Sequence, residues 1–364
     1  MNFDFTERQA KLAQMNDVAA TVIVPGANMV YFTGLHFHLS ERPTLAIFGA
    51  DGQMSVIIPE LEVPKIKARD DLEVRVIAWS DVEGFQGAFE RAVRELGLKG
   101  ETIGVDGQTM RVFEYHAFEQ AGIGKISNVG KQLLDIRAIK TSTEVEAMRK
   151  AIQMSERALE RLVAWVEPGM TEMAIGTELS RLMVLEGSVG EAFSPLIQTG
   201  PNSALPHGFM TERKLQEGEF LLIDFGGKFE GYPADITRTF CLGTPTAEMQ
   251  KIYDAVLAAN RAAIAIAAPG VSCGDVDKAA RDEIVAAGYG EYFIHRTGHG
   301  LGLEGHELPQ IAGGVSDTLQ PGMVFTVEPG IYVPGLGGVR IEDDVAVTET
   351  GVDVLTRYPR QLMR

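Results

Sequence analysis

Two acidic residues in the second half of this 364-residue chain stand where globular proteins rarely place a charge. Asp224 and Glu328 each end a strongly apolar run, Phe-Leu-Leu-Ile-Asp and Met-Val-Phe-Thr-Val-Glu. An isolated buried carboxylate costs several kcal/mol of folding free energy unless it is paired, protonated or bound to a metal. Taken alone, either residue could instead be a strand-end carboxylate that points to water.

A second acid follows the first of these runs at hairpin spacing. Residues 219–225 and 234–240 are predicted to pair as an antiparallel hairpin whose turn is centred on Phe229-Glu230. Asp235 would then face Asp224 directly, with Cβ atoms about 4.5–5.5 Å apart. Two carboxylates at that distance repel each other, so the pairing favours a cation between them.

The same arrangement recurs around Glu328. Glu342 would face it across a turn centred on Gly335. Four carboxylates suit divalent ions such as Mn²⁺, Mg²⁺ or Co²⁺, and their number favours two ions over one. Two neighbouring ions can activate a shared water and polarise a substrate carbonyl. The four acids therefore predict a dinuclear metal site.

Three histidines lie in a glycine-rich stretch between these acidic hairpins: His295, His299 and His306. Glycine lets the backbone approach a bound group closely, and neutral imidazole is a good ligand for Mn, Co and Zn. A histidine that is not a ligand could donate a hydrogen bond to a developing oxyanion. His207 precedes the first hairpin much as His306 precedes the second, which suggests a place on the opposite side of the same site.

An internal repeat positions these residues. Pro168-Gly169 and Pro269-Gly270 each stand between two helical patterns, and residues 215–226 align with residues 319–330. Each copy predicts two helices and then a hairpin. We therefore expect an α+β domain with internal pseudo-two-fold symmetry and with helices on one face of a mainly antiparallel sheet.

The helix starts in this half carry recognisable caps. Thr141 and Glu144 form a capping box that opens a long helix. Thr171 and Ser272 occupy matching places in the two copies, and both are predicted to be helix N-caps. Ser272 also lies in a Gly-x-Ser-x-Gly pattern, but a nucleophile elbow needs a preceding strand, and a helix and a proline stand there instead.

The first part of the chain reads as an ordinary α/β domain. Four strands are predicted at Thr21–Val24, Thr44–Phe48, Met54–Ile58 and Val74–Ile77, and an amphipathic helix at Glu83–Leu96. We place the domain boundary just before the long helix, which gives domains at residues 1–135 and 136–364.

Composition limits the partners and the compartment. Acidic residues outnumber basic ones 50 to 33, and the net charge of −17 argues against nucleic acid or an anionic membrane surface as a partner. The two cysteines cannot form a disulfide framework and indicate a reducing cytoplasm. The N-terminal sequence is not that of a signal peptide, and no apolar run predicts a transmembrane helix.

Several stretches together resemble the pita-bread metallopeptidases, the superfamily that includes methionine aminopeptidase, aminopeptidase P, prolidase and creatinase. They are Leu-Leu-Ile-Asp-Phe-Gly, Gly-Tyr-Pro-Ala-Asp-Ile-Thr-Arg-Thr-Phe, His-Arg-Thr-Gly-His-Gly-Leu-Gly-Leu-Glu-Gly-His-Glu, Val-Glu-Pro-Gly-Ile-Tyr and Gly-Val-Arg-Ile-Glu-Asp. The length and the Tyr-Phe-Thr-Gly at 31–34 resemble the Xaa-Pro peptidases. The resemblance implies a creatinase-like α/β N-terminal domain, a pita-bread catalytic domain and hydrolysis of the bond before proline in short peptides.

The resemblance also implies roles for single residues. Asp235 and Glu342 would bridge two divalent ions, most often Mn with Co or Zn as alternatives, while Asp224 would bind one ion and His299 and Glu328 the other. A metal-bridged hydroxide would attack the scissile carbonyl, and Glu328 would shuttle its proton. His207 and His306 would bind substrate and stabilise the tetrahedral intermediate, and His295 and Arg340 would bind substrate and order the site.

Three questions stay open in the sequence. An N-terminal loop containing His38 and Arg42 is either an exposed loop or a cap over the active site of a partner in a homodimer. Dipeptidase and longer-peptide aminopeptidase activities are not distinguished. The alternatives to a metallopeptidase are a metal-independent hydrolase of the creatinase kind and a non-catalytic binding relative, but relatives of both kinds usually lack the ligand set that is intact here.

Overall fold

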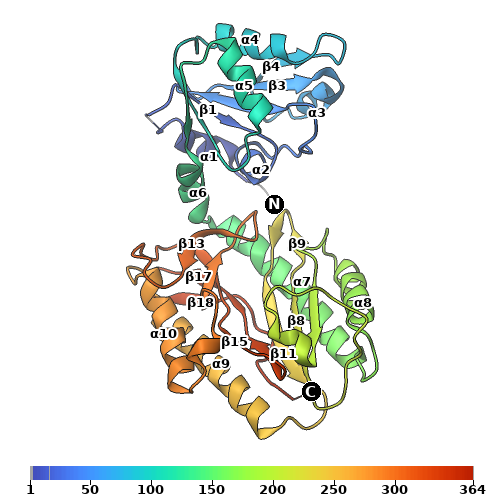
Figure 1. The fold of residues 1–364 in the computed structure, drawn as a ribbon. Helices are drawn as coiled ribbons and strands as arrows, with labels where there is room; N and C mark the ends of the chain where they lie inside the picture. Colours follow the sequence, from blue (N-terminus) through green and yellow to red (C-terminus); the bar gives the residue numbers. More distant parts are fainter. Residues whose placement is uncertain (1–2, 16, 364) are drawn as a thin grey trace. The chain divides into compact units, whose positions relative to one another are not determined.

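The computed structural model describes residues 3–15 and 17–363, which divide into two compact units at Arg137 and Ala138. The N-terminal unit contains a six-stranded sheet of order β4-β3-β2-β1-β5-β6. Helices α4 and α5 pack on one face of this sheet through Phe89 and Phe118, while α1 and α2 lie on the other (Figure 1). The strands are β1 (Ala20–Ile23), β2 (Leu45–Gly49), β3 (Met54–Pro59), β4 (Val74–Trp79), β5 (Thr102–Val105) and β6 (Lys125–Asn128). The helices are α1 (Phe5–Leu12), α2 (Ala27–Thr33), α3 (Val63–Lys67), α4 (Gln86–Glu95), α5 (Val112–Ala121) and α6 (Gly130–Ala138).

The four predicted strands are confirmed as β1 to β4, with ends shifted by at most two residues. The predicted helix at Glu83–Leu96 is α4, which begins three residues later, at Gln86. Parallel pairs β3–β4, β1–β5 and β5–β6 are combined with antiparallel pairs β1–β2 and β2–β3. The unit is therefore an α/β domain, as the sequence predicts.

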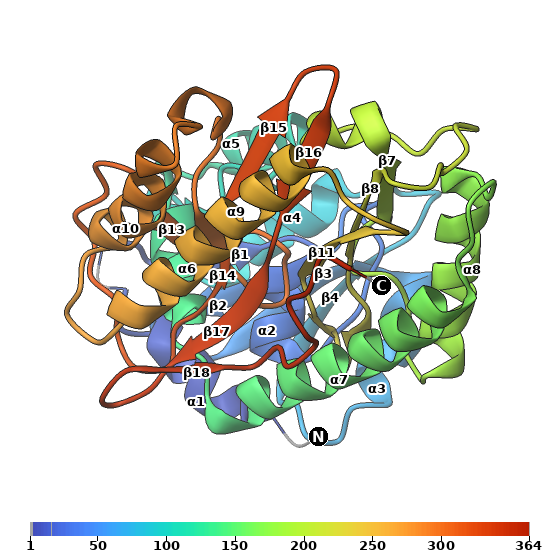
Figure 2. The same cartoon turned by 90° about the horizontal axis from the view of Figure 1, so that it is seen from below.

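The C-terminal unit is built from two copies of one motif, with helices outside and strands inside (Figures 1 and 2). The first copy contains α7 (Ser142–Trp165), α8 (Glu172–Leu185), β7 (Leu196–Thr199), β8 (Phe220–Phe225), β9 (Lys228–Phe229), β10 (Tyr232–Pro233) and β11 (Ile236–Cys241). The second contains α9 (Ala247–Ile266), α10 (Cys273–Ala286), β12 (Gly298–Gly300), β13 (Glu307–Ile311), β14 (Val324–Val327), β15 (Gly330–Val333), β16 (Gly337–Arg340), β17 (Asp343–Val347) and β18 (Val352–Val354). Their sheets have the orders β11-β8-β7 and β13-β12-β14-β17-β18, and the strand pairs are antiparallel.

Matching hydrogen bonds show how closely the copies correspond. The N–H of Gly169 donates to the carbonyl of Leu215 at 2.7 Å, and the N–H of Gly270 donates to that of Leu319 at 2.9 Å. Thr171 and Ser272 cap α8 and α10, and the Thr141–Glu144 capping box opens α7. The predicted repeat, its caps and the α+β class with an α/β N-terminal domain are therefore confirmed.

The register of the first hairpin differs from the prediction. Asp224 pairs with Thr237, and Asp235 lies two residues before that partner. The turn is centred on Glu230 and Gly231. A tight hairpin turn requires positive φ at both central positions, and these residues have φ angles of 51° and 85°. A one-residue shift of the turn moves the pairing by two residues, so Asp224 and Asp235 are diagonal neighbours on the same face.

The second hairpin has the predicted register. Val327 pairs with Asp343 and Gly330 with Arg340, which places Glu328 and Glu342 opposite each other between these pairs. Gly335, with a φ of 83°, lies at the centre of its turn.

Candidate metal centre

The five predicted ligands come from both copies and lie together in the structure. Asp224 is in β8, Asp235 precedes β11, His299 is in β12, Glu328 follows β14, and Glu342 lies between β16 and β17. His299 Nε2 lies 3.2 Å from Glu328 Oε1 and 3.7 Å from Asp235 Oδ2. Ligand atoms of Asp235, His299 and Glu342 all fall within 4.8 Å of one another. This compact set has the donor chemistry that divalent ions prefer.

Two threonine hydroxyls orient the acids of the second copy. Thr237 Oγ1 donates to Glu342 Oε2 at 2.6 Å, and Thr326 Oγ1 donates to Glu328 Oε1 at 3.2 Å. Neither threonine was among the residues predicted from the sequence. A signal was present, because Thr326 stands two residues from Glu328 along a strand, and residues two apart share a face.

The His299 ring is oriented as a metal ligand would be. Its Nδ1 lies 3.1 Å from the carbonyl oxygen of Gly300, which can only accept a hydrogen bond. Nδ1 therefore carries a proton, and Nε2 is the ring atom directed at the acids, where it could bind an ion.

Burial governs the electrostatics of this cluster. It raises the pKa of Asp224 and, with the repulsion of neighbouring carboxylates, raises the pKa values of Asp235 and Glu342 well above their ordinary range. Burial acts in the same direction on Glu328, but the hydrogen bond and charge of His299 outweigh it and lower the pKa of Glu328 to about 2. Carboxylates in this situation are stabilised as anions by a bound cation.

The hydrogen bonding of one carboxylate oxygen indicates whether these residues fit a metal ion. Within the described ranges, Asp224 Oδ1 is buried and receives no hydrogen bond. Its other oxygen, Oδ2, is bound by the Arg340 guanidinium. A buried carboxylate oxygen without a donor is costly, whereas a cation at this atom would satisfy it. The donor set therefore fits divalent metal ions.

Arg340 joins the acids to a histidine. Its Nε donates to Thr237 Oγ1 at 3.1 Å and its Nη1 to Tyr332 Oη at 2.9 Å. Tyr332 Oη in turn lies 2.9 Å from His295 Nε2, and His295 Nδ1 lies 2.7 Å from the carbonyl of Arg296. Burial lowers the pKa of His295, which favours the neutral ring and lets Nε2 accept a hydrogen bond from the Tyr332 hydroxyl. Tyr332 was not among the predicted residues, although it lies in one of the motif stretches.

The remaining predicted residues are more exposed. The His306 ring stands edge-on to His299, with ring centroids 4.1 Å apart, and burial lowers its pKa to about 4. His207 is exposed in the segment that follows the short 3-10 helix Gly200–Ala204. His38 is exposed in the N-terminal unit, in a segment without regular structure before β2. The role of His38 stays a prediction.

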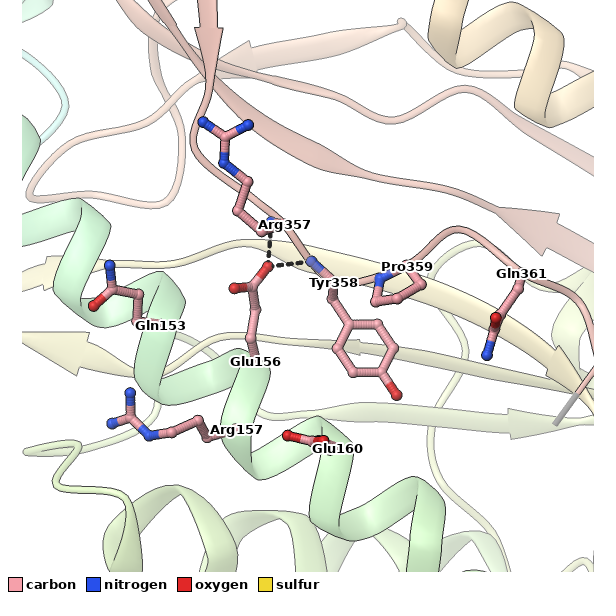
Figure 3. Close-up of a pocket in the computed structure, with 8 residues that line it drawn as sticks. All are labelled: Gln153, Glu156, Arg157, Glu160, Arg357, Tyr358, Pro359 and Gln361. Carbon is pink, nitrogen blue, oxygen red and sulfur yellow. Dashed lines mark hydrogen bonds between the residues drawn. The ribbon is translucent and has the colours of Figure 1, made fainter.

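The C-terminal segment at Arg357 and Tyr358 is hydrogen-bonded to α7 and to Arg238 of β11. Glu156 of α7 accepts the N–H groups of Arg357 and Tyr358, the latter at 2.5 Å, beside a cavity of about 510 Å³ (Figure 3). Arg238 Nη2 donates to the carbonyl of Tyr358 at 2.9 Å, and Arg238 Nη1 donates to that of Glu342 at 2.5 Å. The backbone of Glu342 is thus fixed by a strand of the first copy. None of the predicted site residues lines this cavity.

No helix in the described parts of the chain combines the length and the apolar character needed to span a membrane.

Comparisons with known proteins agree with this architecture. The chain is similar to a solved Xaa-Pro dipeptidase from Bacillus anthracis, with 30% identity, a TM-score of 0.92 and 99% of each chain covered. It is also similar to a solved prolidase from Thermococcus sibiricus, with 33% identity, a TM-score of 0.93 and 100% of each chain covered. An uncharacterised peptidase from Staphylococcus saprophyticus is 36% identical over 342 residues, which are 94% of this chain and 95% of that protein.

Family models match both units. Residues 6–139 match the creatinase/prolidase N-terminal domain, and residues 146–349 match metallopeptidase family M24. The second match spans more than half of the chain and includes both acidic hairpins and the glycine-rich histidine stretch. With its duplicated helix–hairpin motif and its cluster of four acids and a histidine, the chain belongs to metallopeptidase family M24.

Proposed function

We propose that this protein is a dinuclear metal-dependent exopeptidase that hydrolyses the bond between an N-terminal residue and proline. One observation carries the proposal: four carboxylates and one imidazole from both copies converge in a buried cluster, where Asp224 Oδ1 has no donor among the described residues. The names of the two solved relatives, an Xaa-Pro dipeptidase and a prolidase, support the choice of substrate.

Asp224, Asp235, His299, Glu328 and Glu342 would hold the ions, with Asp235 and Glu342 bridging them. When bound, two divalent cations would supply an activated water and polarise the scissile carbonyl. Oxygen and imidazole donors suit Mn²⁺, with Co²⁺ or Zn²⁺ as alternatives.

Glu328 is the proton carrier in this proposal. Thr326 Oγ1 and His299 Nε2 lie 3.2 Å from its Oε1, so the carboxylate is oriented by two fixed groups. It would take a proton from the attacking water and deliver it to the proline nitrogen as that bond breaks. His207 and His306 would bind the substrate and stabilise the tetrahedral oxyanion, while His295 and Arg340 would order the site through Tyr332.

Chelation and metal restoration test the proposal. The purified protein is stripped of metal, supplied with Mn²⁺ or Co²⁺, and assayed on Ala-Pro and on Ala-Pro-Ala-Ala. Metal-dependent release of alanine from at least one peptide is expected, and the ratio of the two kcat/KM values assigns dipeptidase or aminopeptidase activity. Cleavage of neither peptide would overturn the proposal, and activity that survives full chelation would favour a creatinase-like hydrolase.

The assembly and compartment belong to the same proposal. We expect a homodimer in the cytoplasm, where the two free, buried cysteines would stay reduced. Light scattering on the purified protein checks the dimer. If a dimer forms, unchanged kcat/KM in His38→Ala would argue against the N-terminal loop as a cap over the site.

A further inference from the structure

A fully buried amide in the first copy has no partner. Gln198 lies in β7 and is 0% exposed, and neither its Oε1 nor its Nε2 makes a hydrogen bond within the described parts of the chain. A buried polar group left without a hydrogen-bond partner destabilises the folded chain. A position that keeps two such atoms points to a partner that is not part of the folded chain.

The strand directs this amide to the face of the sheet that carries Asp224. Ile197 packs toward α8, where a methyl group added to Gly176 would lie 3.5 Å from its side chain. Successive side chains of a strand point to opposite faces, so Gln198 points away from the helix. The register pairs Leu196 with Asp224 and Gln198 with Leu222, which puts Gln198 on the same face as Asp224.

The repeat relates this position to a predicted metal ligand. Thr199 pairs with Leu221 in the first copy, and Gly300 pairs with Phe325 in the second. Leu221 and Phe325 occupy the same place in the aligned segments that begin at Leu215 and Leu319. Gln198 is therefore the counterpart of His299, which directs its Nε2 at the acids.

The loop that carries His207 closes over the same amide. A methyl group added to Gly208 would collide with Gln198 Nε2, so the backbone of the loop passes directly against the carboxamide. The amide thus lies between the strand that bears Asp224 and the segment that bears an exposed histidine. This is where a small polar molecule bound beside the acids would meet the first copy.

We propose that Gln198 is a substrate-binding residue whose carboxamide hydrogen-bonds the main chain of a bound short peptide. A carboxamide offers both an acceptor and donors, so it can accept a hydrogen bond from the N-terminal amine of such a peptide or donate one to its oxygen atoms. The inference rests on the proposed function, because it assigns the ligand of the same site. At equivalent positions, an imidazole of the second copy would then bind metal and an amide of the first copy would bind peptide.

The test compares Gln198→Leu with Asn260→Leu. Asn260 is an equally buried amide, but its Nδ2 donates to Val327 O at 3.0 Å and to Asp343 Oδ2 at 2.9 Å. Without peptide, Gln198→Leu should raise the unfolding temperature by about 1–3 °C, because it removes unpartnered polar atoms, whereas Asn260→Leu should lower it. Gln198→Met, which is closer in volume, repeats the measurement if the branched side chain clashes.

Peptide binding supplies the second readout. In Gln198→Leu, the KM for Ala-Pro should rise at least about tenfold while kcat changes less than about threefold, and the number of bound Mn²⁺ ions should not change. Calorimetry with Ala-Pro carrying a methylene in place of the scissile carbonyl measures affinity without turnover. A variant that binds this analogue as tightly as the wild type would overturn the inference.

Other outcomes are equally decisive. A lower unfolding temperature with unchanged KM would assign the amide to an ordered water, and a lost metal ion would make it a metal ligand; both overturn the inference. Wild-type protein that binds the analogue but cleaves neither peptide would refute the proposed function alone. Weaker analogue binding by Gln198→Leu would still support the inference in that case.

Discussion

The two copies of the duplicated half share a backbone but differ in what they bring to the centre. The first contributes Asp224 and Asp235 at diagonal positions of a hairpin, and the second contributes Glu328 and Glu342 directly opposite each other. Only the second adds an imidazole, His299, where the first has an amide. The difference indicates that duplication supplies a frame of strand-end acids, to which single residues at equivalent strand positions add different chemical groups.

The largest expected effect comes from removing one acid of each copy in turn. Asp235→Ala and Glu342→Ala should each abolish tight binding of the ion pair and lower kcat/KM at least about a thousandfold, because each removes a predicted bridging ligand. Elemental analysis of the purified variants counts the ions. Two ions per chain in either variant would contradict the bridging role of that residue.

The two threonine supports should differ in strength. Thr237→Val removes a 2.6 Å hydrogen bond to Glu342 and an acceptor for Arg340, and we expect metal affinity to fall about 10–100-fold. Thr326→Val removes a 3.2 Å bond to Glu328 and should cost less. Calorimetric titration with Mn²⁺ measures both, and a larger loss for Thr326→Val would reverse this ranking.

The pH dependence of the metal-free protein separates Glu328 from the other three acids by sign. The raised pKa values of Asp224, Asp235 and Glu342 mean that their contribution to stability is complete below about pH 4 and is lost as the pH rises through the folded-state values. Glu328, with a pKa of about 2, behaves oppositely: its contribution is present above about pH 4 and is lost as the pH falls toward 2.

Calorimetric unfolding in excess chelator should therefore show a midpoint that falls by several degrees between about pH 4 and pH 7. Asp224→Asn should flatten this slope, because it removes a group with a raised pKa, and Glu328→Gln should steepen it. Equal slopes in the two variants would refute the assigned signs.

The smallest effect concerns the hairpin turns. Glu230 adopts a φ of 51°, which costs a side chain about 1 kcal/mol, whereas the turn of the second copy already has Gly335. Glu230→Asn should stabilise the protein by about 0.5–1 kcal/mol in chemical denaturation, because asparagine tolerates this conformation. Gly335→Ala, the matched control, should destabilise it, and a gain there would contradict the argument.

The sequence predicted more of the fold than of the site's supporting contacts. Alternating apolar residues, caps and the repeat were sufficient for β1 to β4, α7 and the duplicated motif. The predicted turn of the first hairpin was centred one residue too early in the sequence. The pattern of apolar residues is the same for strand registers that differ by two residues, so it could not distinguish them. Gly231 was the better guide, since it tolerates the positive φ of the turn.

The cluster of five predicted ligands lies together in the structure, while their roles stay predictions. The sequence indicated these residues because charges at the ends of apolar strands are expensive. Tyr332 and Gln198 were missed because an uncharged polar residue inside a strand gives no such signal. Only the fold shows that Tyr332 joins His295 to Arg340, or that Gln198 has no partner in the described chain.

The bonds by which Thr237 and Arg238 of the first copy hold Glu342 of the second have a kinetic consequence. An ion bound by acids of both copies would leave more readily when these hydrogen bonds open and the two copies move apart locally. The rate of metal release would therefore depend on local opening of the folded chain. Mild denaturant would accelerate this release well before the chain unfolds. The lifetime of the bound ions would then depend on how often the hydrogen bonds between the two copies open.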